Sequence, residues 1–529
     1  MGLIDLQDLP SDQAFEADVV IVGAGVAGLV LADALRGSGL NVDVLEAGGA
    51  ALEPQSQALY EAEMAGMPHV GTTEGRFRVY GGSSTRWGGQ LLPLAANDFE
   101  PRGHVPHSGW PISSGDLTPY LQRCEELLGV NHSPYDAALL QQLPQPWPQL
   151  SEEALRLRFS KWAPFRSRNL AQTLGRRCQA DPQTRIFLHA TVTAVELHMD
   201  GSHVENLQVR TFSGDNFSFK GRQVVIAAGS IETSRLLLAS RSVHSDGIAN
   251  QTDQLGRWFH DHLAVKAATL QPRRRREFLK RLAPWFLGDT RHTLKIESTE
   301  EWQAQQGCLN VMGHLVFQSP ENSGFAWLRQ QLLARQIGSA SEEKLPAPAL
   351  QEIPGEAFDL LYLAWKRMAR QRRWCPSNAE ITLSIDTEQQ PNPESRIRLS
   401  ANLDAMGMAK AIVQWQWGEP ERRTFAAYRQ LFNQQWQAWD GGQISWSESF
   451  EPDSGWEKGV KDIYHLMGGT RMTSDPHKGI VDPNLGVHGI DNLSIASLSV
   501  FPTGGSSNPT LTLMMLTLRL AERLRAQMG

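Results

Sequence analysis

The sequence predicts an α/β protein whose mainly parallel sheet is joined to a second, differently built part. Residues 17–49 hold an apolar run, a glycine turn, a helical stretch and a second apolar run, which together make one βαβ unit. Residues 222–240 repeat the order of apolar strand, small-residue turn and helix. Between about 265 and 455 the pattern changes to basic, Trp-rich helical stretches and alternating strand-like runs.

The elements of the βαβ unit follow from local composition. Residues 19–22 are apolar throughout, as in a strand that is buried on both faces of a parallel sheet. A helix is expected over 29–36, ending near Gly37 and Gly39, and a second strand over 42–45. Farther along, strands are expected at 184–197, 379–386, 395–400 and 411–417, and helices at 420–439 and 508–528.

Composition is that of an ordinary globular chain. Its 529 residues are 41% hydrophobic and 20% charged, and the length favours two to four domains. The net charge of −7 gives no support to a nucleic-acid partner. None of the four cysteines stands in a CxxC pair, so neither a metal site nor a disulfide framework is expected. The first residues lack an apolar signal region, and no run approaches the roughly 18 apolar residues of a spanning helix. We therefore expect a cytoplasmic protein.

The glycine turn of the βαβ unit has the pattern of a dinucleotide site. Gly23, Gly25 and Gly28 form GxGxxG between strand and helix. The first glycine permits a tight turn, the second lets a pyrophosphate approach the backbone, and the third lets helix and strand pack closely. Glu46 ends the second strand, where a carboxylate accepts hydrogen bonds from ribose hydroxyls. An acid here favours FAD or NAD over NADP, because NADP carries a 2′-phosphate.

Five ordered segments resemble the glucose–methanol–choline (GMC) family of flavin oxidoreductases, from about residue 17 to the C-terminus. They are residues 79–100, 224–240, 255–262, 388–408 and 465–512. The resemblance implies a Rossmann-type FAD-binding domain and a substrate domain on a mainly antiparallel sheet flanked by helices. It implies FAD domain ranges of 1–110, 185–265 and 455–529. Residues 111–184 and 266–454 would form the substrate domain and lid segments.

The same resemblance implies the cofactor contacts. The residues expected around FAD are Gly23, Gly25, Val26, Ala27, Gly28, Glu46, Ala47, Gly82, Ser83, Ser84, Arg86, Trp87, Val192, Ala227, Ala228, Gly229, Ser497, Leu498, Pro509 and Thr510. The motifs look most like those of pyranose oxidases and bacterial sugar or glycoside dehydrogenases. Arg86 stands where pyranose oxidases carry a flavin-linked histidine, so the flavin is expected to be noncovalent. An ordinary salt-bridged arginine is the alternative. Ser497 replaces an Asp that often reaches the flavin.

His465 and Asn508 are the candidate catalytic residues. Taken alone, His465 is readily a structural residue, and Asn508 before Pro509 has the pattern of a helix cap. In GMC enzymes the matching positions carry the catalytic His and an Asn or His. Imidazole is suited to accept a hydroxyl proton, and an amide is suited to hold the hydroxyl oxygen. We expect Gly468 and Gly469 to let the backbone approach a flat cofactor, and the rate to rise with pH through the histidine range.

Two cationic stretches, 271–286 and 358–374, have three interpretations. The first is membrane-surface contact, which would bring the flavin near a quinone. The second, which we favour, is a helix whose apolar stripe of Leu361, Trp365 and Met368 packs inward. The third is an anionic glycan or protein partner. The favoured interpretation predicts no stable membrane insertion and no flotation with anionic liposomes.

The expected function is oxidation of a CH–OH group in a sugar, glycoside or polyol by hydride transfer to flavin N5, with His465 as base. The alternatives are the same chemistry on a non-carbohydrate alcohol, the reverse reduction, and a non-catalytic flavoprotein. An intact pair of His465 and Asn508 argues against the last. The electron acceptor is O₂, a quinone or another carrier.

Overall fold

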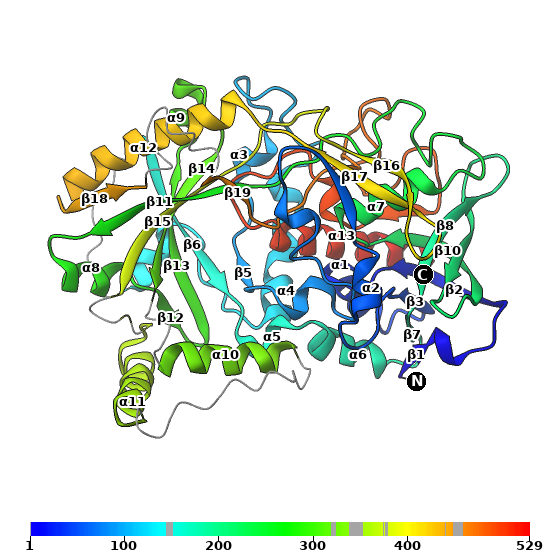
Figure 1. The fold of residues 1–529 in the computed structure, drawn as a ribbon, viewed down its shortest axis with the longest axis horizontal. Helices are drawn as coiled ribbons and strands as arrows, with labels where there is room; N and C mark the ends of the chain where they lie inside the picture. The colour runs from blue at the N-terminus through cyan, green and yellow to red at the C-terminus, as the bar shows by residue number, and fades with distance from the viewer. Residues whose placement is uncertain are drawn as a thin grey trace.

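The computed structural model describes residues 2–143, 152–318, 324–337, 353–373, 375, 379–439, 441–447 and 459–529. Two large sheets form its two ends, with helices between and around them (Figure 1). A mainly parallel sheet lies on the right of the view, and an antiparallel sheet lies on the left. The expected fold class is confirmed, including the change of sheet type between the two parts.

The mainly parallel sheet has eight strands. In spatial order they are β1 (Leu3–Asp5), β7 (Thr184–Leu188), β3 (Val42–Leu45), β2 (Gln13–Val22), β10 (Asn216–Ile226), β9 (Val204–Arg210) and β8 (Thr191–Leu197), with β20 (Leu493–Ile495) also on β10. The strands from β1 to β10 run parallel, whereas β9 pairs antiparallel with both β10 and β8. The single strand expected at 184–197 is therefore two strands, β7 and β8.

Helices cover this sheet. They include α1 (Val26–Leu35) and α13 (Thr510–Met528), which pack against each other, and α7 (Ser230–Ala239) after β10. The other helices of this part are α2 (Pro54–Ala58), α3 (Ala96–Phe99), α4 (Thr118–Leu128), α5 (Phe165–Arg168) and α6 (Arg176–Gln179). The apolar residues of β2, α1 and α13 belong to one continuous core, which explains why the last helix is so apolar.

The second sheet is antiparallel throughout. Its strands in order are β18 (Gln443–Trp446), β11 (Leu263–Gln271), β15 (Glu380–Thr387), β14 (Val311–Gln318), β13 (Thr290–Ser298), β6 (Leu155–Trp162) and β5 (Gln90–Leu91), with β12 (Trp285–Leu287) on β13 and β19 (Lys461–Asp462) on β11. Its helices are α8 (Arg275–Leu282), α9 (Glu300–Gln306), α10 (Gly324–Ile337), α11 (Ile353–Arg370) and α12 (Glu419–Trp439). Phe425, Tyr428 and Trp436 of α12 are fully buried in a second core.

A three-stranded sheet joins the two parts. It consists of β16 (Arg396–Leu403), β17 (Ala409–Trp415) and β4 (Ala62–Gly66), and β17 runs parallel to β4. Helix α7 packs against β16 and β17. Strands β5 and β19 also join the antiparallel sheet from ranges predicted for the FAD domain. The division of the chain into two domains stays a prediction. We propose that the chain passes from one domain to the other at these strands.

Helix α11 differs from the sequence prediction. Leu361, Trp365 and Met368 are 71%, 46% and 81% exposed, so the apolar stripe faces outward and the expectation of inward packing is wrong. The opposite side of the helix touches the body, where Arg367 donates to the Gly288 carbonyl and to Asp289. Helical periodicity defines an apolar face but does not say which way that face points. Across the described residues, no helix is long and apolar enough to cross a membrane.

Candidate active site

A cavity of about 740 Å³ lies at the carboxyl ends of the parallel strands, between the two parts. Val22, Leu45 and Ala227, at or just after the ends of β2, β3 and β10, line it, as expected for ligand sites on open α/β sheets. The structure brings nearly all predicted site residues to this wall. They are Gly23, Gly25, Val26, Ala27, Glu46, Ala47, Gly82, Ser83, Ser84, Arg86, Trp87, Val192, Ala227, Ala228, Gly229, His465, Ser497, Leu498, Asn508 and Thr510. Gly28 and Pro509 are not among the lining residues.

The three glycines of the turn have distinct surroundings. A Cβ on Gly23 would lie 2.6 Å from the Ala227 carbonyl oxygen, and the backbone of Gly23 has a positive φ of 106°. A Cβ on Gly28 would lie 1.9 Å from the Gly23 carbonyl oxygen, so this glycine serves packing of α1 on the turn. A Cβ on Gly25 would meet nothing within 4 Å, because this backbone faces the cavity. Gly25 therefore leaves room for a ligand at the start of α1.

Glu46 lies on the cavity wall and is held by backbone groups. Its two carboxylate oxygens accept hydrogen bonds from the N–H groups of Ala24 (3.0 Å) and Gly48 (2.9 Å). Burial raises the pKa of Glu46 to about 7, although these two N–H groups and Arg78 favour the charged form. Arg78 also lines the cavity, and its Nε and Nη1 have no partner among the described residues. Sequence analysis missed Arg78, since an arginine outside a recognised motif carries no signal of its own.

Arg86 is one of the residues that line the cavity. Its guanidinium stacks over the Phe77 ring at 4.8 Å, and its Nη1 donates to the Thr85 hydroxyl at 3.2 Å. The salt-bridged alternative is not supported, because Arg86 forms no ion pair within the described ranges. Burial lowers its pKa from the ordinary value, but an arginine stays cationic. The cavity lining therefore includes this cation.

His465 and Asn508 meet on the cavity wall, although the sequence separates them widely. Asn508 Nδ2 lies 3.4 Å from His465 Nε2, and Asn508 Oδ1 has no partner among the described residues. Helix α13 begins at Thr510, and Asn508 makes no capping hydrogen bond to it, so the helix-cap interpretation is wrong. Thr510 and Leu513 of its first turn line the cavity, which puts the positive end of α13 there.

Two expectations about His465 change. Its pKa is lowered to about 3, first by burial and second by the neighbouring His262, so the neutral base predominates throughout the ordinary histidine range. The following glycines do not line the cavity. A Cβ on Gly468 would lie 1.9 Å from the Trp258 carbonyl oxygen, and one on Gly469 would lie 2.3 Å from Ser234 Oγ. Because neither glycine has a side chain, the backbone here can pack closely against α7 and against the loop at Trp258. Both glycines also have a positive φ.

Comparisons with known proteins agree with this geometry. Residues 391–517 match the family model described as GMC oxidoreductase, and residues 18–278 match the model described as FAD dependent oxidoreductase. The chain is an FAD-dependent GMC oxidoreductase.

Relatives match over nearly the whole chain at low identity. The fructose dehydrogenase large subunit of Gluconobacter japonicus is 23% identical, over 97% of this chain and 98% of its own. The 6'''-hydroxyparomomycin C oxidase of Streptomyces lividus is 24% identical, over 97% and 92%. The 2-methyl-1,2-propanediol dehydrogenase of Mycolicibacterium austroafricanum is 22% identical, over 96% and 95%.

Solved structures share the fold. Pyridoxine 4-oxidase from Mesorbium loti aligns with a TM-score of 0.54 at 17% identity, over 96% of this chain and 98% of that one. A formate oxidase aligns with a TM-score of 0.56 at 14% identity, over 98% and 99%.

The residues of this GMC oxidoreductase fit FAD. Gly25 leaves the start of α1 open where a pyrophosphate needs backbone N–H groups, and the Glu46 carboxylate lies at the adjoining strand end. The unpartnered nitrogens of Arg78 and the cation of Arg86 suit an anionic, aromatic ligand along the wall. His465 and Asn508 line the same cavity as these groups.

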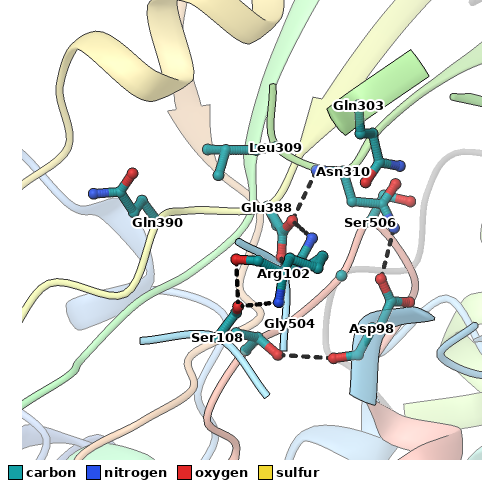
Figure 2. Close-up of polar contacts among 12 residues, drawn as sticks. Asp98, Arg102, Ser108, Gln303, Leu309, Asn310, Glu388, Gln390, Gly504 and Ser506 are labelled. Atoms are coloured by element: carbon teal, nitrogen blue, oxygen red, sulfur yellow. Dashed lines mark hydrogen bonds and ion pairs between the residues drawn. The ribbon is translucent and has the colours of Figure 1, made fainter. Parts of the chain in front are cut away.

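A buried polar network supports the loop that carries Asn508 (Figure 2). Arg102 forms a bidentate ion pair with Glu388, and Asn310 joins Glu388 to Asp98 through its backbone N–H (2.7 Å) and side-chain amide (2.7 Å). Ser506 Oγ donates to Glu297 at 2.6 Å. Burial and the neighbouring carboxylates raise the pKa of Asp98 to about 6. Ser506, together with Thr503, whose hydroxyl donates to the Asp98 carbonyl at 3.1 Å, ties the 503–508 loop to β13 and α3.

Replacement of Gly25 and Gly28 by alanine should separate ligand binding from packing. Gly25→Ala should weaken FAD binding by at least about 10-fold, because the methyl group enters the cavity, and should cost the cofactor-free protein less than about 1 kcal/mol. Gly28→Ala should lower the free energy of unfolding by about 1–3 kcal/mol with or without FAD. FAD titration and urea unfolding measure the two effects. Equal behaviour of the two variants would contradict the assignment.

FAD affinity should rise with pH through about pH 7 because of Glu46. Above its raised pKa the carboxylate accepts hydrogen bonds from ribose hydroxyls, and below it the protonated group loses part of that capacity. We expect a gain of about 10-fold between pH 6 and 8, since a hydrogen bond to a charged group is worth about 1.5–3 kcal/mol. Glu46→Gln should abolish the slope. An unchanged slope in this variant would assign the pH dependence to another group.

Proposed function

We propose that this GMC oxidoreductase oxidises a CH–OH group of a sugar, glycoside, aminoglycoside or polyol, with His465 as the base. The observation that carries the proposal is the contact of His465 Nε2 with the Asn508 amide on the wall of the cavity that the cofactor residues line. Two relatives named above act, by their names, on fructose and on a paromomycin derivative, which supports a carbohydrate substrate. Cytoplasmic location stays a prediction from the sequence.

The residues divide the reaction between them. Bound FAD supplies the acceptor for the hydrogen that leaves the alcohol carbon with its electron pair. His465 Nε2 accepts the hydroxyl proton as the C=O bond forms, and a neutral imidazole is required for this. The Asn508 amide holds the reacting oxygen while the α13 N-terminus supplies a favourable field for negative charge. The electron acceptor that reoxidises the cofactor is proposed to be O₂, a quinone or another carrier.

A second substrate class has specific support. The relative from Mycolicibacterium is named for 2-methyl-1,2-propanediol, which is an alcohol but no sugar. An anaerobic screen against sugars, glycosides, aminoglycosides, polyols and simple diols decides between the classes, with loss of oxidised flavin absorbance as the readout. Bleaching by carbohydrates supports the proposal. Bleaching by simple diols alone favours the second class, and no bleaching by any alcohol contradicts both.

FAD should be bound noncovalently. Arg86 cannot form the histidyl link, and among the lining residues of the described chain the one histidine is His465 and cysteine is absent. Acid precipitation of the purified protein should therefore release the yellow colour into the supernatant. Colour that stays in the protein pellet would contradict this prediction.

Replacement of His465 should remove the base without removing FAD. His465→Ala should slow flavin reduction by about 10²–10⁴ in stopped-flow measurements, the usual contribution of a general base. The parent rate should be flat from about pH 5 to 8, because neutral His465 predominates above its lowered pKa of about 3.

Asn508→Ala is the matched control for the same cavity wall. It should slow flavin reduction less than His465→Ala does. The midpoint of the unfolding transition should stay unchanged, because Asn508 caps no helix. A folded, flavin-replete His465→Ala protein that reduces its flavin as fast as the parent would refute the role of this histidine.

A further inference from the structure

We propose that His262 is a positioning residue that fixes the proton of neutral His465 on Nδ1, so that Nε2 stays free to accept the substrate proton. The inference rests on the proposed role of His465 as the base. His262 belongs to the 258–262 segment that precedes β11, and the two rings meet edge to face with centroids 5.0 Å apart. The feature that carries the inference is the chain of hydrogen bonds that runs through both imidazoles.

The chain begins at two backbone carbonyls. His262 Nε2 lies 2.7 Å from the Gly505 carbonyl oxygen and 3.2 Å from that of Gly504. A carbonyl oxygen only accepts hydrogen bonds, so Nε2 of His262 must carry a proton. In a neutral imidazole the other nitrogen then has a lone pair and accepts. His262 Nδ1 is therefore an acceptor.

The acceptor faces His465. His262 Nδ1 lies 2.8 Å from His465 Nδ1, a distance that requires one proton between the two nitrogens. Because His262 Nδ1 accepts, His465 Nδ1 must donate, and the lone pair of neutral His465 is then on Nε2. That atom faces Asn508 Nδ2 at 3.4 Å, on the cavity side. The amide donor opposite Nε2 agrees with this placement of the proton.

The backbone fixes the positions of both rings. Asp261 Oδ1 accepts hydrogen bonds from the backbone N–H of His262 (2.6 Å) and of His465 (2.9 Å). One buried carboxylate oxygen thus joins the two segments that carry the rings. This clamp holds the two backbone segments close enough for the rings to meet, with 2.8 Å between their Nδ1 atoms.

His262 is enclosed by a small set of hydrogen-bond partners. It is 1% exposed, and its side-chain partners in the described chain are His465 and the two carbonyls. The geometry itself places the protons: the Asn508 amide donor opposite His465 Nε2 calls for a lone pair there, so His465 Nδ1 carries the proton and His262 Nδ1 accepts it. The charged and titratable groups that surround the two rings are Asp261, His260 and His69 near the segment, Lys295 on β13, His314 on β14, Asp386 on β15 and Glu388 just after it.

The tautomer can be read directly by nitrogen NMR of the FAD-loaded enzyme labelled with ¹⁵N-histidine. The His465 signals are assigned by their loss in a His465→Asn variant. At pH 7 we expect a proton on Nδ1 and none on Nε2. A proton on Nε2 of His465, as a doubly protonated His262 would impose, overturns the inference. The measurement needs no substrate, so it stands even if the proposed function fails.

Two amide variants test the consequence for the reaction. In His262→Asn the amide oxygen can take the place of Nδ1 and still accept from His465. In His262→Gln the amide can reach Gly505 but not His465. We expect flavin reduction by His262→Asn to stay within about 10-fold of the parent, and by His262→Gln to fall by at least about 10² at saturating substrate. Substrate affinity should change much less.

The variants also distinguish positioning from packing. Both keep a polar side chain of similar volume, and FAD content and the unfolding midpoint report folding separately from rate. Equal rates in folded His262→Asn and His262→Gln overturn the inference. Where His262→Gln does not hold FAD, the NMR measurement on the parent enzyme decides.

Discussion

One buried carboxylate, that of Asp261, joins the segments that carry the proposed base His465 and its neighbour His262. Its Oδ1 accepts hydrogen bonds from the backbone N–H groups of both residues, and its Oδ2 lies 3.4 Å from His69 Nε2. A carboxylate removed from water is costly unless hydrogen bonds replace its hydration. The two N–H groups supply that compensation at Oδ1, whereas Oδ2 has no hydrogen-bond partner among the described residues. The contact with Oδ1 fixes the backbone of His465, so the proposed base is preorganised before substrate arrives.

The proposed partner of the base, Asn508, is held by the loop that precedes it. This loop is tied to β13 through Ser506 and Glu297 and to α3 through Thr503 and the Asp98 carbonyl, and it supplies the carbonyls that face His262. The mainly parallel sheet contributes the glycine turn that lines the cavity, and Glu297 on β13 of the antiparallel sheet anchors the loop. The relative position of His465 and Asn508 therefore depends on contacts with both parts of the fold, and small displacements of either part would alter it.

The sequence was most informative where local chemistry determines structure. The strand, glycine turn, helix and terminal Glu46 are close together in the chain, so spacing alone predicted their arrangement. Contacts between distant residues were beyond such reasoning. His262 lies in a segment matched to the family, yet its contact with His465 joins positions 203 residues apart. Nor could periodicity tell that Leu361 and Met368 face outward, or that Gly468 and Gly469 pack against protein.

The cofactor site is built from strands and helices that lie far apart in the chain, and this determines when it can form during synthesis. Strand β10 pairs with β2 near the N-terminus and with β20 near the C-terminus, α1 packs on α13, and Ala62 pairs with Ala411. A nascent chain that has just left the ribosome can form the βαβ unit, but it lacks the last strand and the last helix. Such long-range pairings form late in folding, because the entropy cost of closing the long intervening loops must be met first. The cofactor site is therefore complete only once β20 and α13 have been synthesised, and until then the apolar face of α1 needs protection.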